Sequence, residues 1–307
     1  MSTMVLKTKL RIKRRDISSP FLIGLLALAI LVGAMLAALV YYSLPALSVY
    51  GLSIYADNQW NPSMNHFGGL AAIYGTFLVS LTALIIAMPL AIGSAVFVNE
   101  YVPGKLRDYL TTVNDMMAGF PTVIYGFWGL YVLGPMLNST VFNWLHNNLG
   151  FIPLFSTKPL GGSYLLASVV LAIMITPFAS SLVREVYAQI PIGIIEGIHA
   201  LGLSRWDAIR IKLSYIRRAI IGALTLALGR GIGETVAVAL TVGGALRISP
   251  SLLSPGITIP SLIANQFGSA YTLLEQSAMF SLALLLLVIG ASFIALSRLL
   301  VLRGGAW

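Results

Sequence analysis

The amino-acid sequence predicts an all-α membrane protein with six transmembrane helices. Hydrophobic residues make up 58% of the 307 residues and charged residues only 9%, whereas about a quarter of the residues in a typical soluble domain are charged. Long uncharged apolar runs recur along the chain, and a helix needs about 20 such residues to cross the ~30 Å hydrocarbon layer of a bilayer. Together, the composition and these runs exclude an ordinary soluble fold.

Six apolar runs are long enough to span the bilayer, and each is bounded by polar, charged or proline-rich residues. The expected spans cover residues 21–44, 71–98, 116–137, 164–183, 219–245 and 278–297. The first run is longer than the apolar core of a signal peptide, which has about 7 to 15 residues, so we expect it to be retained as a span. We expect residues 1–20 to form a basic cytoplasmic tail and residues 21–300 a single transmembrane domain.

The distribution of positive charge predicts the orientation in the membrane. If the N-terminus is cytoplasmic, 16 of the 19 Lys and Arg residues fall on the cytoplasmic side. Positive charge is retained on that side, so both termini are predicted to be cytoplasmic in a multi-pass protein of the cell membrane. The same asymmetry accounts for the net charge of +9. We expect a lipid bilayer and no nucleic acid as partner, because no soluble segment is long enough to display a basic binding surface.

The sequence lacks the motifs of nucleotide-hydrolysing and nucleophilic enzymes. It has no G-x-x-x-x-G-K-[ST] phosphate loop, no G-x-S-x-G motif and no Cys, and its three His residues lie far apart. We therefore expect a protein without catalytic residues, bound metal or a cofactor of its own.

Residues 185–217, between the fourth and fifth spans, carry apolar side chains at three- and four-residue steps, which indicates amphipathic helices. Pro191 suits the first turn of a first helix, and Gly202 ends it. The hydroxyl of Ser204 is placed to cap a second helix ahead of Asp207. The pattern predicts a helical hairpin on the inner surface, which either lies on lipid headgroups or docks a soluble partner.

A second unusual segment lies inside the fifth apolar run, where Gly229-Arg230-Gly231-Ile232-Gly233-Glu234-Thr235 interrupts residues 219–245. Arg230 lies 12 residues past Arg218, so a continuous helix would place it about 18 Å along the axis, near the bilayer midplane. Arg230 and Glu234 are spaced i and i+4, which predicts that they share one helical face and can pair.

Two interpretations of this segment remain open. The first is a buried ion pair that fixes helix register. The second is an anion pathway, in which the planar guanidinium of Arg230 binds phosphate oxygens in a bidentate fork. Glu234 would then accept a hydrogen bond from a phosphate O–H, which fully ionised sulfate lacks, and Thr235 would add a hydroxyl.

The run from Glu196 to Arg210 resembles the EAA loop of ABC importer permeases. Glu196 and Gly202 match the motif at its six-residue spacing, although Gly197 and Ile198 replace the two alanines. The resemblance implies a type I ABC importer permease in which hairpin 185–217 is the coupling helix that sits in a cleft of an ATPase subunit. The implied coupling residues are Glu196, Gly202, Arg205, Trp206 and Asp207.

A broader resemblance covers residues 55–300. The run Gly233-Glu234-Thr235-Val236-Ala237-Val238 resembles the C-type permease subunits of phosphate ABC importers, as do residues 60–62, 74–76 and 120–130. The resemblance implies a phosphate pathway through Arg230, Glu234 and Thr235, an A-type permease partner, two ATP-binding cassette ATPase subunits that use the ATP, and an extracytoplasmic phosphate-binding protein. The alternatives are a permease for another oxyanion or small solute, a stand-alone secondary anion transporter, and a purely structural membrane protein.

Overall fold

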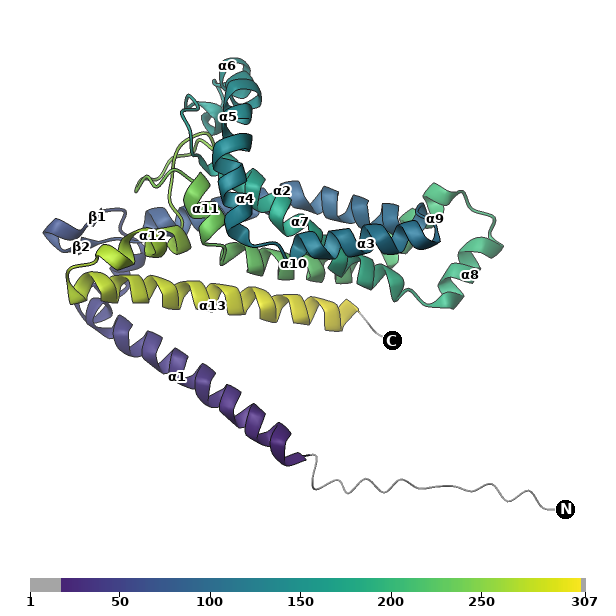
Figure 1. Cartoon of the computed structure of the whole chain (residues 1–307), viewed down its shortest axis with the longest axis horizontal. Coiled ribbons are helices and arrows are strands. Elements are labelled where there is room, and N and C mark those ends of the chain that lie inside the picture. The colour runs from purple at the N-terminus through teal and green to yellow at the C-terminus, as the bar shows by residue number, and fades with distance from the viewer. Residues whose placement is uncertain (1–17, 305–307) are drawn as a thin grey trace.

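The computed structural model describes residues 18–304, and these are mostly helical (Figure 1), so the all-α membrane class is confirmed. Most of the predicted basic tail, residues 1–17, lies outside the described residues. The helices are α1 (Ser18–Tyr50), α2 (Leu70–Glu100), α3 (Gly104–Ala118), α4 (Thr122–Trp128), α5 (Gly134–Leu137), α6 (Asn143–Leu149), α7 (Tyr164–Ala188), α8 (Ile192–Ala200), α9 (Arg205–Tyr215), α10 (Arg217–Ile232), α11 (Val236–Thr241), α12 (Ile259–Gln266) and α13 (Leu273–Gly304). Two short strands, β1 (Trp60–Asn61) and β2 (His66–Phe67), pair antiparallel.

The described residues contain four single helices that are long and apolar enough to cross a membrane, namely α1, α2, α7 and α13. A fifth candidate is the bent pair formed by α3 and the run Thr122–Leu149, which meet at an angle of 85°. The predicted span over residues 219–245 is not one helix, because α10 ends at Ile232 and α11 starts at Val236. The count of six continuous spans is therefore not reproduced.

The centre of the molecule is a bundle in which α2, α7, α10 and α13 run side by side (Figure 1). Helix α2 packs most extensively against α7. Its buried face carries alanines at every fourth position, Ala83, Ala87, Ala91 and Ala95, and each is fully buried. Such small side chains let two helix backbones approach closely, which is how membrane helices gain packing contacts in a solvent as apolar as themselves.

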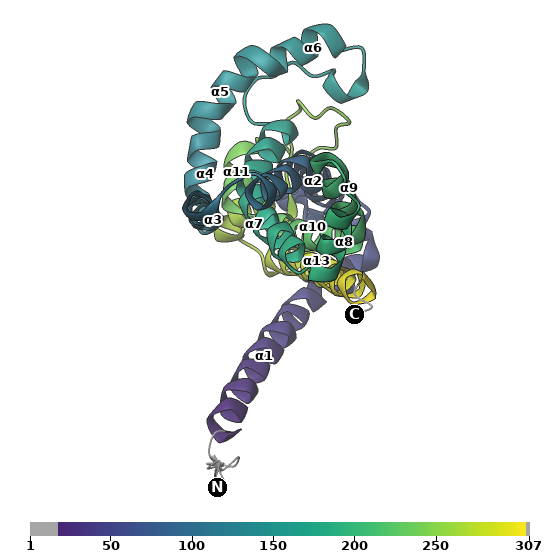
Figure 2. The ribbon, with the colours of Figure 1, turned by 90° about the vertical axis from the view of Figure 1, so that its right-hand side faces the viewer.

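Two segments leave this bundle. The run α4–α6 projects away from it (Figure 2), and this run contains two π-helical stretches, Gly129–Leu133 and Asn138–Phe142. Helix α1 meets α13 near one end of the bundle and diverges from it along its length (Figure 1). The α8–α9 hairpin lies at one end of the bundle, and the strands and α12 lie at the other.

The irregular segment 243–258, which links α11 to α12, is packed into the protein at the strand end. Leu253 and Ile257 are fully buried. A Cβ at Gly256 would lie 1.9 Å from Cζ of Tyr164, so only glycine fits under this ring. The Tyr164 hydroxyl also donates to the backbone oxygen of Arg247, at 3.2 Å. The segment thereby fixes the C-terminal end of α11 against α7.

Candidate functional site

The predicted helical pairing of Arg230 with Glu234 is wrong, because the helix ends between them. Gly233 caps α10 by donating to the backbone oxygen of Arg230 at 3.2 Å. The Glu234 carboxylate turns to the next helix, where Oε1 accepts from the backbone N–H of Ala237 at 3.3 Å, and the Thr235 hydroxyl donates to the Gly233 oxygen at 3.2 Å. Three glycines in five residues give this stretch a low helix propensity, which explains the break.

Arg230 instead reaches a segment 112 residues away in the chain. Its Nη2 donates to the backbone oxygen of Ala118, the last residue of α3, at 3.2 Å. Its guanidinium lies 4.8 Å from the ring centroid of Phe178 on α7. A cation is favourable at a helix C-terminus, where the backbone carbonyls carry partial negative charge, and over an aromatic face. Among the described residues no salt bridge joins Arg230 to an acid.

Two helix breaks therefore meet at this arginine. The chain turns by 85° after Ala118, at Gly119-Phe120-Pro121, and it breaks again at residues 233–235. We call residues 118–121 and 230–235 the helix-break junction. Arg230 is exposed there, and Glu234 and Thr235 are half-buried. The structure thus places all three predicted pathway residues in this junction, with Arg230 exposed.

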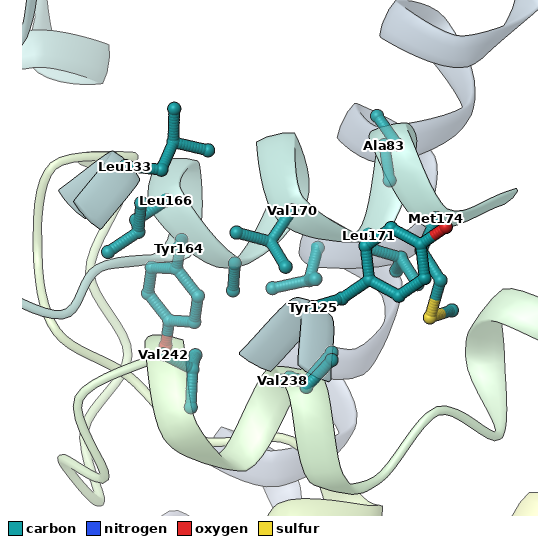
Figure 3. Close-up of a cluster of buried hydrophobic side chains, with 14 of the residues drawn as sticks. Ala83, Tyr125, Leu133, Tyr164, Leu166, Val170, Leu171, Met174, Val238 and Val242 are labelled. Atoms are coloured by element: carbon teal, nitrogen blue, oxygen red, sulfur yellow. The ribbon is translucent and has the colours of Figure 1, made fainter. Parts of the chain in front are cut away.

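The junction is positioned by tight packing between α4, α7 and α11. Figure 3 shows Tyr125 of α4 and Val238 of α11 beside the α7 side chains Val170 and Met174. Gly126 makes this approach possible, since a Cβ there would lie 2.7 Å from a methyl carbon of Leu240 and 3.0 Å from Cα of Ala237. The helix-break junction is therefore held in position by the packed core around it.

The predicted hairpin is present as α8 and α9. Gly202 connects them with φ +61°, a left-handed conformation that glycine adopts without strain. The Ser204 hydroxyl caps α9 by accepting from the backbone N–H of Asp207 at 3.2 Å, as its position in the sequence predicts. One side of the hairpin is held in the protein by buried Ile198 and Ile209. The proposed coupling residues Glu196, Gly202, Arg205, Trp206 and Asp207 are all exposed.

Sequence reasoning missed a buried charge cluster behind this hairpin. Oε1 of Glu100, at the end of α2, accepts from Lys212 Nζ of α9 at 2.6 Å and from the Tyr187 hydroxyl of α7, also at 2.6 Å. We call these residues the buried triad. An acid directly after an apolar span was a visible signal, but its partners lie far away in the sequence.

A second charge pair lies at the opposite end of the bundle, in the segment that carries the strands. The carboxylate of Asp57 contacts His66 Nε2 and accepts from the backbone N–H of Gln59 at 3.0 Å. The hydrogen bond from Gln59 and that from His66 hold the pKa of Asp57 below its usual value.

Comparison with known proteins agrees with this architecture. Residues 87–303 match the family model described as binding-protein-dependent transport system inner membrane component. A chain of the MetNI methionine ABC transporter, solved in inward-facing conformations, has the same fold, with a TM-score of 0.52 and 18% identity over 75% of this chain and 95% of that one. These matches define the class as a membrane permease of a binding-protein-dependent transport system.

Curated relatives place the chain more narrowly. It is 43% identical to the phosphate transport system permease protein PstC of Xylella fastidiosa, with 84% of this chain and 81% of that one covered. It is 39% identical to the PstC of Mesorhizobium japonicum, covering 89% and 85%. The chain belongs to the PstC family of permeases.

Proposed function

We propose that this chain is the non-catalytic permease subunit of an ATP-driven importer and forms part of the pathway for inorganic phosphate. It assembles with an A-type permease, two ATP-binding cassette ATPase subunits and an extracytoplasmic phosphate-binding protein. The observation that carries the proposal is the exposed guanidinium of Arg230 at the helix-break junction. Family membership supports the substrate, because the curated relatives carry phosphate transport in their names.

The depth of Arg230 supports a pathway role. Helix α10 is continuous from Arg217 to Ile232, so Arg230 lies roughly 18 Å along it from the basic residues at its start. A charge at that depth is costly against lipid, and such residues face protein or a water-filled cavity. A partner permease that covers this face encloses Arg230 in a shared pathway.

The chemistry of the junction fits phosphate. No carboxylate pairs with Arg230 in the described residues, so its remaining donors are available to the oxygens of an anion in a planar fork. Glu234 supplies an acceptor for a phosphate O–H and Thr235 a hydroxyl, and both are half-buried residues of the same junction. Broken helices that line a substrate site within the membrane recur in transporters.

The hairpin supports ATPase docking. Its outward side presents large apolar side chains, with Trp206 61% and Leu201 72% exposed, while its inner side is anchored in the protein. The start of α1 and the end of α13 lie toward the end of the bundle that carries the hairpin (Figure 1). This arrangement agrees with the prediction that both termini and the hairpin are cytoplasmic.

The pathway is tested by replacing Arg230 and Glu234 together with Gln. We expect a complex that assembles and binds its ATPase but takes up labelled phosphate into vesicles at least about tenfold more slowly, since a hydrogen bond to a charged group contributes about 1.5–3 kcal/mol. The control is Lys158→Gln, which removes the charge of an exposed lysine outside the predicted spans and should leave uptake unchanged. Uptake at the wild-type rate by the double variant would refute the pathway role.

Docking is tested separately with Trp206→Glu. We expect its affinity for the ATPase subunits to fall by about 2 kcal/mol or more, as for an aromatic anchor at an interface. Trp144→Glu is the control, because Trp144 is similarly exposed, at 58%, but lies on α6, away from the hairpin. Affinity is measured by titrating purified ATPase onto the reconstituted permease pair. Equal binding by both variants contradicts docking through the hairpin.

A further inference from the structure

The buried triad is the place where the hairpin is bonded to the membrane bundle. Glu100 ends α2, Tyr187 lies in the last turn of α7, and Lys212 belongs to α9. Both other residues donate to one carboxylate oxygen of Glu100, each at 2.6 Å. Three helices therefore converge on a single oxygen atom.

The charges of the triad are withdrawn from solvent. The side chains of Lys212 and Glu100 are 9% and 14% exposed. Lys212 is the one buried Lys or Arg among the residues whose burial the structure describes. Burying an ion pair costs desolvation energy that apolar residues avoid, so a gain in stability is a weak explanation for this pair. A buried pair does, however, favour a single relative arrangement of the helices that carry it.

Contacts around the triad join the same elements. The guanidinium of Arg205 on α9 lies 4.8 Å from the ring centroid of Tyr101, the residue that follows Glu100. Tyr187 also belongs to an apolar cluster with Ala95 of α2 and Ile216, which follows α9. The hairpin is thus held on its inner side to the ends of both α2 and α7.

Helix α7 continues from the triad to the junction. Tyr187 and Phe178 both lie on this helix. The guanidinium of Arg230 lies over the Phe178 ring, 4.8 Å from its centroid. A displacement of the hairpin that moves Tyr187 therefore also moves the surface on which Arg230 rests.

We propose that Glu100, Tyr187 and Lys212 are positioning residues that transmit movement of the hairpin to α2 and α7, and through α7 to the helix-break junction. The proposal rests on the proposed docking of the ATPase at this hairpin. The triad contacts neither nucleotide nor phosphate; it sets how much phosphate is moved for each ATP that the partner hydrolyses.

The decisive variant is Glu100→Gln combined with Lys212→Met, in the complete complex with permease partner, ATPases and binding protein in vesicles. Removing both charges leaves no unpaired buried ion, so the protein should fold. We expect the ratio of phosphate imported to ATP hydrolysed to fall by about 5- to 150-fold, the usual range of a coupling free energy between two sites. Lys105→Met removes an exposed lysine of α3 and should leave the ratio unchanged.

Tyr187→Phe is the second test, since it removes one hydrogen bond and keeps both charges paired. We expect a smaller fall in the same ratio, with co-purification of the ATPase unaltered. A wild-type ratio in Tyr187→Phe and in a stable double variant would show that the triad is only structural. Failure of the docking proposal would be recognised separately, because Trp206→Glu would then bind the ATPase subunits with wild-type affinity.

Discussion

The helix-break junction and the buried triad each hold a cation against a partner 112 residues away in the chain, but they hold it differently. At the junction an exposed guanidinium donates one hydrogen bond of 3.2 Å to a backbone carbonyl, that of Ala118. In the triad a buried ammonium lies 2.6 Å from a carboxylate. The first cation keeps donors available for a ligand, whereas the second is buried and paired with an acid of the protein. The difference separates a site suited to binding from one suited to holding structure.

The largest expected contrast is in stability. Lys212→Met leaves Glu100 buried and unpaired, so we expect a loss of about 3–5 kcal/mol in the free energy of unfolding. Arg230→Gln loses one exposed hydrogen bond and should cost about 1 kcal/mol or less. Chemical denaturation of the detergent-solubilised protein measures both. Equal losses in the two variants would remove the distinction between the sites.

A smaller effect is expected from the packing that positions the junction. Gly126→Val would crowd Leu240 and Ala237 of α11, and overpacking of a core costs about 1–3 kcal/mol. We expect phosphate uptake to fall with it, because α11 starts directly after residues 230–235 of the junction. Gly33→Ala on α1 is the control: nothing lies within 4 Å of a Cβ there, and Ala is favoured over Gly in a helix by about 0.5–1 kcal/mol. The melting temperature and the rate of phosphate uptake should both fall for Gly126→Val. Wild-type values of both would contradict the packing argument.

The smallest effect concerns pH and the exposed pair of Asp57 with His66. The pKa of Asp57 is lowered in the folded protein, so its contribution to stability is present above the unfolded-state value of about 3.8 and is lost as pH falls through the lower folded value. The Asp57 and His66 side chains are 37% and 42% exposed, so the contribution should be at most about 1 kcal/mol. Melting temperatures of the wild type and Asp57→Asn should differ at pH 6, and the difference should shrink as the pH is lowered below about 3.8. A difference that does not shrink there would assign the effect to something other than this carboxylate.

Local signals in the sequence predicted the hairpin well. The apolar spacing, the Gly202 break and the Ser204 cap depend on residues only a few positions apart, and each is found where the pattern places it. The membrane class and the long apolar helices follow from composition in the same way. The assignments of coupling residues to an ATPase and of Arg230, Glu234 and Thr235 to phosphate remain predictions.

The junction and the triad depend on contacts that no local pattern contains. The i, i+4 rule places Arg230 and Glu234 on one face only if the helix is unbroken. The glycines around Arg230 favour a break, and α10 ends at Ile232. The true partner of Arg230 is a backbone carbonyl, which carries no side-chain signature in the sequence. Lys212 reads as an ordinary surface residue until α9 folds against the end of α2.

The buried alanines along α2 have a mechanical consequence. A methyl group has no rotamers, so packing Ala83, Ala87, Ala91 and Ala95 costs no side-chain entropy and leaves no alternative arrangement at those positions. A seam built from long flexible side chains can absorb a small displacement by rotamer changes, but close-packed methyl groups cannot. The α2–α7 pair should therefore behave as a stiff element, in which a shift imposed at one end reappears with little loss at the other.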